Sequence, residues 1–386
     1  MKKTVMDKLL AHAVKSGASD IHFLVGNQPS FRIDGVLRSL KYKALDPADT
    51  RQIGLNLLGA ASIDRLTEMQ EHDASYSLEG AARFRVNLFR QRGSLCAILR
   101  VISSEVPDID ALGLPPRVRE LAEEERGLVL VTGATGSGKS STLASMIKHI
   151  NQSRAAHILT IEDPIEFLHS NSKASVSQRE VGPDTRSFTT ALRAALRQDP
   201  DVIMVGEMRD AETIDIALKS AETGHMVFST VHTTDAAKTI GRLVGVFPAE
   251  EQHGVRLRLA ESLKGTISQR LLPRADGAGR VVAAEIMIST KTIQECIKDP
   301  MKTGEITDVI ERSRDQYGMQ TFDQEVSRLY RAGVIELEVA KSAATNAADF
   351  ERALNFGNEA FDPNDDSENE DQEKEDDVLE LELEVG

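Results

Sequence analysis

The feature that most constrains the fold of this chain is the octapeptide GATGSGKS at residues 133–140. It fits the pattern G-x-x-x-x-G-K-[ST] and lies between an apolar run, LVLVT, and a helical segment, STLASMIKHI. This strand–loop–helix context distinguishes a phosphate-binding loop from a chance match. Glycines allow backbone N–H groups to turn inward and hold phosphates at the N-terminus of the following helix. The sequence therefore predicts a P-loop; a glycine-rich turn that binds nothing is the competing interpretation.

The P-loop pattern assigns separate roles to its side chains. We expect Lys139 to reach the β- and γ-phosphates of a nucleotide and the Ser140 hydroxyl to ligate Mg²⁺. The expected nucleotide-binding residues are those of the loop and of the first helical turn: Gly133, Ala134, Thr135, Gly136, Ser137, Gly138, Lys139, Ser140 and Ser141.

Apolar runs alternate with helical segments after residue 126. The runs LVLVT, HILTIE, DVIMVG and MVFSTVH are separated by segments with helical character such as AETIDIALKSAETG. That alternation is typical of an α/β domain in which a parallel sheet carries helices on both faces.

The segments around this domain have different patterns. Residues 20–102 read as short strands with turn residues between them, interrupted by a helical stretch at 48–69, which predicts a small α+β domain with an antiparallel sheet. The proline-rich segment VPDIDALGLPP predicts a linker. The expected organisation is an N-terminal domain (1–105), a linker (106–117), a P-loop domain (118–275), a mainly helical C-terminal subdomain (276–357) and an acidic, disordered tail (358–386).

Acidity is concentrated in that tail. Residues 362–384 hold thirteen Asp and Glu against one Lys, which is −12 of the chain's formal charge of −15, so the charge says little about partners of the folded part. Its end, VLELELEV, alternates apolar and acidic residues, and we hypothesise that it adds as a strand to a partner's sheet edge.

Cellular location is indicated by what the sequence lacks. The two cysteines form no C-x-x-C pair, the start is not a signal peptide, and no apolar run is long enough to span a membrane. We expect a cytoplasmic protein whose membrane contact is peripheral.

The strand DVIMV ends in Gly206, where an ordinary P-loop NTPase carries the aspartate that helps to hold Mg²⁺, and Glu207 follows one residue later. Glu162 and Asp163 end the neighbouring apolar run, and the carboxyl ends of parallel strands share one ligand crevice. We hypothesise that Gly206 leaves room beside the phosphates, that Ser140 and Glu162 hold Mg²⁺, and that Glu207 orients and deprotonates the attacking water. A strand-capping acidic turn is the competing interpretation for Glu162.

Two histidines flank the strand MVFST. His232 follows it at the predicted phosphate edge and is expected to contact the γ-phosphate, and His225, which precedes it, is expected to bind nucleotide. For each, a structural histidine with satisfied hydrogen bonds is the competing interpretation.

Four ordered segments together resemble the secretion ATPase superfamily that drives type II secretion and type IV pili. They are GATGSGKS (Walker A), ILTIEDPIEF (Asp box), DPDVIMVGEMRD (Walker B) and AETGHMVFSTVHTTDA (His box), and the resemblance runs from about residue 5 to about residue 355. Within the superfamily the chain is most similar to the PilT/PilU branch of pilus retraction motors. The resemblance implies a PAS-like N-terminal domain, a RecA-like ATPase domain, and ATP with Mg²⁺ as cofactors. It also implies that Arg85 and Arg100 are directed at the nucleotide; a solvated face of the small sheet is the competing interpretation.

The resemblance also implies an assembly and a task. ATP would bind between the two domains of each subunit in a homohexameric ring, and hydrolysis would move one domain against the other. The ring would act at the inner membrane on a pilus platform protein, with a paralogous motor subunit as a further candidate partner and no nucleic acid. Pilin subunits would then return to the bilayer, which is pilus retraction.

One segment departs from the branch. Where retraction motors carry a motif close to A-I-R-N-L-I-R-E, residues 292–299 read TIQECIKD; Ile293 and Ile297 keep the apolar positions, while Gln294 and Lys298 replace the arginines. This departure weakens the transfer of the retraction role but not that of ATP hydrolysis. Three alternatives to retraction stay open: an accessory ring subunit with slow turnover, an extension or secretion ATPase of the same superfamily, and a P-loop kinase.

Overall fold

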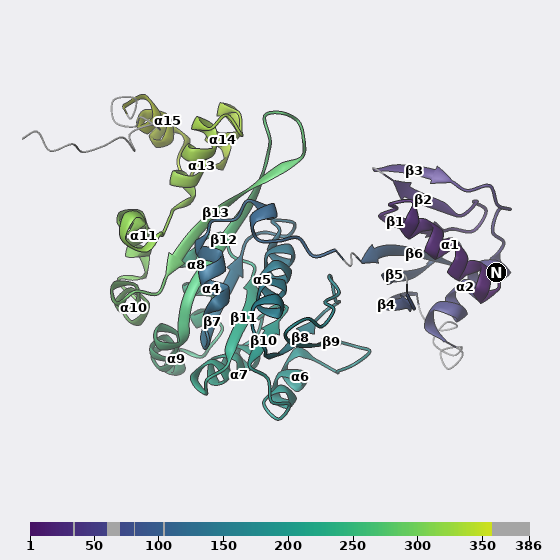
Figure 1. The fold of residues 1–386 in the computed structure, drawn as a ribbon, viewed down its shortest axis with the longest axis horizontal. Coiled ribbons are helices and arrows are strands. Elements are labelled where there is room, and N and C mark those ends of the chain that lie inside the picture. Colours follow the sequence, from purple (N-terminus) through teal and green to yellow (C-terminus); the bar gives the residue numbers. More distant parts are fainter. Residues whose placement is uncertain (34, 60–69, 81, 103–104, 357–386) are drawn as a thin grey trace, which may run out of the picture.

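The computed structural model describes residues 1–33, 35–59, 70–80, 82–102 and 105–356 (Figure 1). The acidic tail, and with it the proposed strand addition by VLELELEV, lies outside the described residues. Residues 60–69 of the predicted helix at 48–69, and residues 103–104 at the start of the connection between the two domains, also lie outside the described residues.

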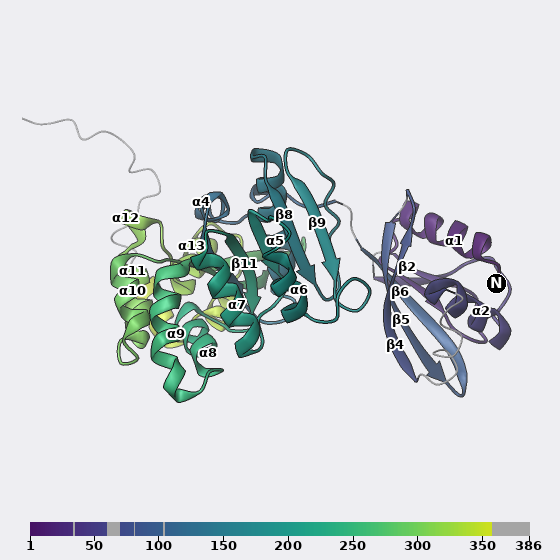
Figure 2. The ribbon, with the colours of Figure 1, turned by 90° about the horizontal axis from the view of Figure 1, so that it is seen from below.

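The N-terminal domain is an antiparallel sheet covered on one face by two helices (Figures 1 and 2). The strand order is β3-β2-β1-β6-β5-β4, which confirms the predicted α+β architecture. The helices are α1 (Lys3–Lys15) and α2 (Pro47–Leu58); the strands are β1 (Asp20–Phe23), β2 (Ser30–Ile33), β3 (Val36–Ser39), β4 (Glu71–Leu78), β5 (Ala82–Gln91) and β6 (Ser94–Ile102). The core forms where the apolar stripes of both helices meet alternate strand residues such as Phe84, Val86 and Leu88.

The start of α2 follows from its sequence. The Asp46 side chain accepts the backbone N–H of Asp49, the Asp49 side chain accepts the N–H of Asp46, and Pro47 occupies the first helical turn. This reciprocal cap satisfies N–H groups that the helix itself cannot pair.

The ATPase domain contains a second sheet with the order β13-β12-β7-β11-β10-β8-β9. Six of its strands run parallel to one another: β7 (Gly127–Thr132), β8 (His157–Glu162), β9 (Ser175–Glu180), β10 (Val202–Val205), β11 (Met226–Val231) and β12 (Leu263–Pro273). Two apolar cores lie on its two faces, because Leu128 and Leu130 of β7 point into one and Val129 and Val131 into the other. The helices on the faces confirm the predicted α/β layering.

The helices of this domain divide between the two cores. Helices α4 (Arg117–Glu123) and α5 (Lys139–Ser153) pack on one face, and α6 (Phe188–Ala195), α7 (Ala211–Glu222), α8 (Ala236–Gly245) and α9 (Ala249–Ser262) pack on the other. The crossovers from β7 to β8, from β9 to β10, from β10 to β11 and from β11 to β12 carry these helices, whereas β8 and the edge strand β9 are joined without one. The central strands β7, β10 and β11 are therefore buried on both sides.

The boundary predicted at residue 275 divides two hydrogen-bonded strands. Strand β13 (Arg280–Ile288) pairs antiparallel with β12 along its whole length and so extends the nucleotide-binding sheet. The turn between them, DGAG, has a domain-break composition, but Gly277 and Gly279 take the positive φ angles of a tight hairpin. A boundary after Ile288 keeps the sheet whole.

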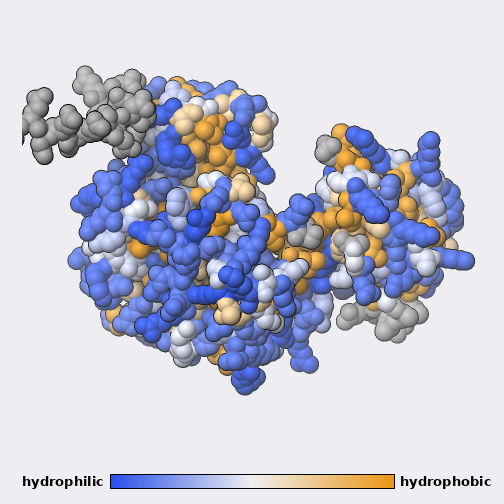
Figure 3. Space-filling model, in the orientation of Figure 1, coloured by the Kyte–Doolittle hydropathy of each residue, from blue (hydrophilic) through white to orange (hydrophobic). Residues whose placement is uncertain are grey.

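Strand β13 contributes to three separate cores. Met287 belongs to the core under α7 to α9, Ala284 and Ile286 belong to the core under α5, and Ala283 belongs to a small core that it shares with the last helices. The C-terminal helices are α10 (Lys291–Lys298), α11 (Ile306–Arg312), α12 (Arg314–Tyr317), α13 (Phe322–Arg331), α14 (Leu337–Ala343) and α15 (Ala347–Phe356). Hydrophobic atoms over the α13–α14 region are visible in Figure 3 on a face that is otherwise mostly hydrophilic.

Much of the predicted linker packs on the ATPase domain. Ile109 and Leu114 are buried in the same core as Val118 of α4 and Ile147 of α5. The proline-rich segment is therefore not a free linker along its whole length. From Ile109 onward it packs as part of the ATPase domain.

The helix α10 contains the segment that departs from the retraction motors. Ile293 and Ile297 are buried, and Gln294 and Lys298 are half-buried. The retained apolar positions thus face the core.

In the described residues, no helix is both long enough and apolar enough to cross a lipid bilayer.

Candidate functional site

The P-loop connects the end of β7 to the start of α5. Gly133 has a φ of +146°, and a Cβ there would lie 2.4 Å from the Ser137 Oγ and 2.6 Å from the Gln269 carbonyl oxygen. Gly136 and Gly138 also have positive φ angles, and Gly138 is the N-cap of α5. The glycines are therefore required by the path of the backbone, as the sequence pattern predicted.

Lys139 is buried at the mouth of this loop. Its Nζ donates hydrogen bonds of 2.9 Å to the carbonyl oxygens of Gly133 and Ala134. Burial lowers the pKa of the ammonium, while the negative charges of Glu207 and Glu166 act in the opposite direction. The ammonium is thus positioned beside the loop that would hold the phosphates.

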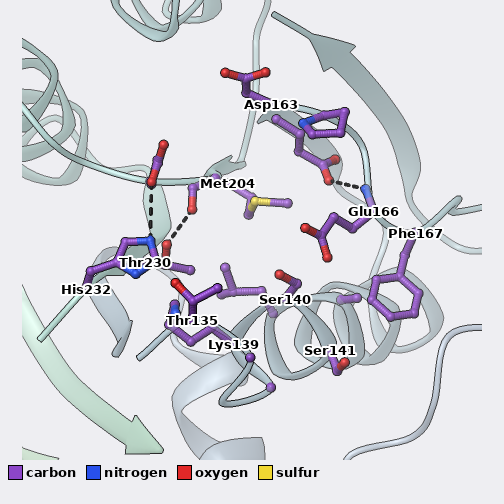
Figure 4. A pocket seen from close by; sticks show the side chains of 18 of the residues that line it. Thr135, Lys139, Ser140, Ser141, Asp163, Glu166, Phe167, Met204, Thr230 and His232 are labelled. Atoms are coloured by element: carbon purple, nitrogen blue, oxygen red, sulfur yellow. Dashed lines mark hydrogen bonds and ion pairs between the residues drawn. The ribbon is translucent and has the colours of Figure 1, made fainter. Parts of the chain in front are cut away.

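A cavity of about 600 Å³ opens above the P-loop (Figure 4). Its walls come from the P-loop, from the carboxyl ends of β8, β10 and β11, and from the N-terminal domain. Of the residues expected to bind or catalyse, the following line it: Thr135, Gly136, Gly138, Lys139, Ser140, Ser141, Glu162, Glu207, His232, Arg85 and Arg100. Gly133, Ala134 and Ser137 lie on the back of the same loop and line an adjoining cavity.

Glu207 follows β10, and its carboxylate lies beside the side chains of Arg209 and His232. Its Oε1 is 2.6 Å from Nη2 of Arg209, and its Oε2 is 3.4 Å from Nε2 of His232. The carboxylate is 15% exposed, so it is largely withdrawn from water but reaches the cavity. His232 at the end of β11 thus touches the carboxylate directly (Figure 4).

Gly206 has a packing role that the sequence did not suggest. A Cβ at this position would meet the Ile161 carbonyl oxygen at 3.3 Å and the Glu162 Cα at 3.5 Å. The Gly206 N–H also donates to the Ile161 carbonyl oxygen at 2.8 Å. The missing side chain thus allows β10 to lie close to the end of β8, and Gly206 also borders the cavity, so room beside the phosphates stays a prediction.

Glu162 ends β8 and is buried. Its Oε1 accepts hydrogen bonds from the Thr160 hydroxyl at 2.6 Å and the Gln178 amide at 3.1 Å, and its Oε2 accepts the Glu166 N–H at 3.4 Å. Burial raises the pKa of the carboxyl despite these three donors. The donors fix the orientation of the side chain against the cavity wall.

The same segment brings two more carboxylates to the cavity: Asp163, which the sequence placed at the crevice beside Glu162, and Glu166, which it did not single out. Glu166 is exposed and points into the cavity near Ser140, and Asp163 lies at the rim (Figure 4). Glu166 stands in the quoted segment EDPIEF, so its proximity to the strand end was the available signal. Arg209 and Arg280 also line the cavity, and Arg209 had a similar signal because it lies two residues after Glu207.

The acidic and hydroxyl groups of the cavity fit a magnesium ion that is carried by a nucleotide. In the parts of the chain that the structure describes, no three His, Cys, Asp or Glu side chains form a group able to hold a metal by themselves. Mg²⁺ commonly takes one or two protein oxygens and completes its shell with phosphate oxygens and water. The Ser140 hydroxyl with a carboxylate such as Glu162 suits that mode.

Arg85 and Arg100 come from the N-terminal domain. They are direct cross-strand neighbours on β5 and β6, and both side chains line the cavity. The Arg100 Nε donates to Asp20 Oδ1 at 2.9 Å, while the side chain remains 70% exposed. Two guanidinium groups therefore face the P-loop from a second domain.

His225 lies away from this cavity, contrary to the sequence prediction. It precedes β11, and its carbonyl oxygen accepts the N–H of Gly127 at the start of β7, which is the opposite end of the sheet from the P-loop. Its Nδ1 lies 2.9 Å from the Ser220 carbonyl oxygen and 3.2 Å from the Thr223 hydroxyl. His225 is a structural histidine at the end of α7.

Comparisons with known proteins agree with this geometry. The family described as "Type II/IV secretion system protein" matches residues 1–353. The pilus retraction ATPase PilT of Pseudomonas aeruginosa is 46% identical over 337 residues, which is 87% of this chain and 97% of that protein. The type IV pilus ATPase PilU of the same organism is 38% identical and covers 92% of each chain.

A solved structure gives the same result. The crystal structure of the pilus retraction motor PilT with bound ADP superposes with a TM-score of 0.82 at 46% identity, covering 90% of this chain and 99% of that one. With a family match over almost the whole described chain and a relative of this identity and coverage, the chain belongs to the type II/IV secretion system protein family.

Proposed function

We propose that this chain is an ATP-hydrolysing motor subunit that powers type IV pilus retraction and, through it, twitching motility. The observation that carries the proposal is the meeting, in one cavity, of a P-loop, a strand-end glutamate and two arginines from a second domain. The relative named as a pilus retraction ATPase supports the biological task.

The residues divide the work of hydrolysis. Lys139 binds the β- and γ-phosphates, and Ser140 together with Glu162 would hold Mg²⁺, whose charge would neutralise the phosphate oxygens. Glu207 orients the attacking water and accepts its proton. His232, 3.4 Å from Glu207, keeps that carboxylate aimed at the water and contacts the γ-phosphate.

The two arginines make turnover depend on domain position. Arg85 and Arg100 stabilise charge on the γ-phosphate only when the N-terminal domain lies close to the P-loop. Hydrolysis and phosphate release then remove the anion that holds the domains together. The resulting domain movement is the mechanical step of the motor.

The assembly that fits this task is a homohexameric ring at the cytoplasmic face of the inner membrane. The ring acts on a membrane platform protein, a paralogous motor subunit is a candidate second component, and nucleic acid is not a partner. Deletion of the gene should give cells whose pili extend and fail to retract. Cells that still retract normally would refute the biological part of the proposal.

Phosphate release by the purified full-length chain tests the chemistry. Glu207→Gln removes the proton acceptor with little change in shape and should lower turnover by about 10²-fold or more while Mg·ATP binding is kept. Glu251→Gln, an exposed glutamate on α9, is the matched control and should leave turnover unchanged. A wild-type rate no higher than that of Glu207→Gln would refute the motor function.

Glu162→Gln separates the metal role from the base role. It should raise the Mg²⁺ concentration needed for half-maximal turnover, whereas Glu207→Gln should leave that concentration unchanged. Normal metal dependence in both variants would overturn the assignment of Glu162.

A second candidate is an accessory ring subunit with weak turnover. It is favoured by Gln294 and Lys298, which stand where retraction motors carry arginines. The phosphate-release measurement distinguishes the two functions, because an accessory subunit would show little turnover without a partner motor.

A further inference from the structure

We infer that Arg83 and Glu180 are positioning residues that link the orientation of the N-terminal domain to the catalytic segment containing Glu162 and Glu166. This inference rests on the proposed ATPase function and assigns roles to two residues outside the P-loop cavity. Arg83 belongs to β5 of the N-terminal domain, and Glu180 ends β9, the edge strand of the nucleotide-binding sheet. Their side chains form an ion pair across the two domains, with Arg83 Nη2 2.9 Å from Glu180 Oε2.

Arg83 is fixed on its own domain. Its guanidinium donates to the Ser75 hydroxyl at 2.9 Å and to the Ser77 hydroxyl at 3.2 Å, both on the neighbouring strand β4. Residues two apart on a strand face the same side, so Arg83 and Arg85 point from β5 toward the ATPase domain together. Arg83 contacts the sheet edge while Arg85 contacts the cavity.

Glu180 is fixed on the ATPase domain and touches the catalytic segment. The oxygen that pairs with Arg83, Oε2, also accepts the backbone N–H of Ile165 at 3.1 Å. The next residue, Glu166, donates its N–H to the Glu162 carboxylate at 3.4 Å. Strand β9 adds a second connection, since the Val181 N–H donates to the Glu162 carbonyl oxygen at 2.8 Å.

These contacts form a continuous path from one domain to the other domain's catalytic carboxylate. The Glu180 side chain is 3% exposed, and a buried carboxylate is costly unless a cation or several donors satisfy it. When the N-terminal domain moves away, Arg83 leaves, and Glu180 keeps the uncharged N–H of Ile165 as a donor. The presence or absence of the Arg83–Glu180 ion pair therefore changes how firmly the segment 163–166 is held. The geometry around Glu162 then depends on domain closure through a contact separate from those of Arg85 and Arg100.

The decisive test measures the segment itself. In the full-length protein without nucleotide, Arg83→Gln should increase amide hydrogen exchange in peptides covering residues 163–168, although the substitution lies in the other domain. Arg119→Gln is the matched control, because it removes an exposed ion pair with Asp110 outside the interface and should leave that exchange unchanged. Unchanged exchange in Arg83→Gln would overturn the inference.

Turnover supplies the second readout. Loss of a charge-assisted hydrogen bond corresponds to about tenfold or more in an equilibrium constant, so Arg83→Gln and Glu180→Gln should each lower kcat about tenfold with a smaller change in KM. The double variant should be no worse than either single variant, because both remove the same contact. Arg83→Lys should recover part of kcat. Additive losses of kcat in the double variant, or an unchanged kcat in the single variants, would overturn the inference. A wild-type turnover no higher than that of Glu207→Gln would instead refute the proposed function. In that case the hydrogen-exchange result remains the test of the link between Arg83 and the segment 163–168.

Discussion

Glu285→Gln should abolish a specific pH dependence of folding stability. Glu285 lies on β13, is buried, and its Oε1 accepts hydrogen bonds from the Ala236 N–H at 2.8 Å and from the Ser268 hydroxyl at 3.2 Å. Burial, together with the nearby charge of Asp235, raises the pKa of its carboxyl to about 7, against the opposing effect of the Ala236 and Ser268 donors and of Arg270. The amide oxygen of glutamine can accept both hydrogen bonds without titrating.

The size and sign of the effect follow from proton linkage. A glutamate has an ordinary pKa of 4.5 when exposed in the unfolded chain, and Glu285 has a pKa of about 7 when folded. Between these two values the folded state holds a proton that the unfolded state has lost, so stability falls as pH rises through the window. The full difference corresponds to roughly 3 kcal/mol, or about 6–12 °C in Tm for a domain of this size.

The assay compares urea unfolding of wild type and variant at pH 5 and pH 8, at one protein concentration. The wild type alone does not report the effect cleanly. Burial lowers the pKa of His169 to about 4, so its contribution to stability rises with pH between about 4 and 6.5 and opposes that of Glu285. Subtracting the variant cancels this contribution, because His169 is present in both proteins.

We expect the free energy of unfolding of the wild type, relative to that of Glu285→Gln, to be roughly 2.5 kcal/mol lower at pH 8 than at pH 5. This is less than the full difference because the unfolded glutamate is still partly protonated at pH 5. Glu251 is exposed, so Glu251→Gln should differ from the wild type in free energy of unfolding by the same amount at both pH values. An equal difference at both pH values for Glu285→Gln would refute the reasoning.

Three further outcomes are expected. Gly133→Ala should abolish binding of a fluorescent ATP analogue, because the added Cβ would lie 2.4 Å from the Ser137 Oγ; retained affinity would show that the loop can rearrange. Arg100→Gln should lower kcat by about 10³-fold with nucleotide binding largely kept, as for other arginines that stabilise a transferring phosphoryl group, and a change confined to KM would contradict that role. His225→Ala should leave kcat within about twofold of wild type while His232→Ala lowers it about tenfold, measured by phosphate release, and equal effects would place both histidines in the same role.

The local parts of the site could be predicted from sequence because they are short-range patterns. The P-loop is one contiguous segment, and Glu162 and Glu207 follow directly from the rule that carboxyl ends of parallel strands meet. The position of His225 was also within reach, because residues 225 and 232 are separated by a whole strand, about 20 Å in an extended chain. Flanking a strand places two residues at opposite edges of the sheet.

The parts that were missed depend on contacts between distant residues or on turns that resemble boundaries. Arg83 and Glu180 are 97 residues apart, and neither carries a motif that would pair them. The role of Gly206 depends on the closeness of β8, which only the assembled sheet determines. The turn at Gly277 and Gly279 has the composition of a domain junction, and only the register of β13 on β12 shows that it is a hairpin.

The sharing of β13 among three cores makes the ATPase domain and the C-terminal helices one cooperative folding unit. A protein cut at residue 275 would lose a strand from its sheet and turn β12 into an unprotected edge, which is a site for aggregation. The same sharing excludes a loosely tethered C-terminal appendage. A load applied to the last helices therefore reaches the sheet that carries the P-loop without crossing a flexible joint.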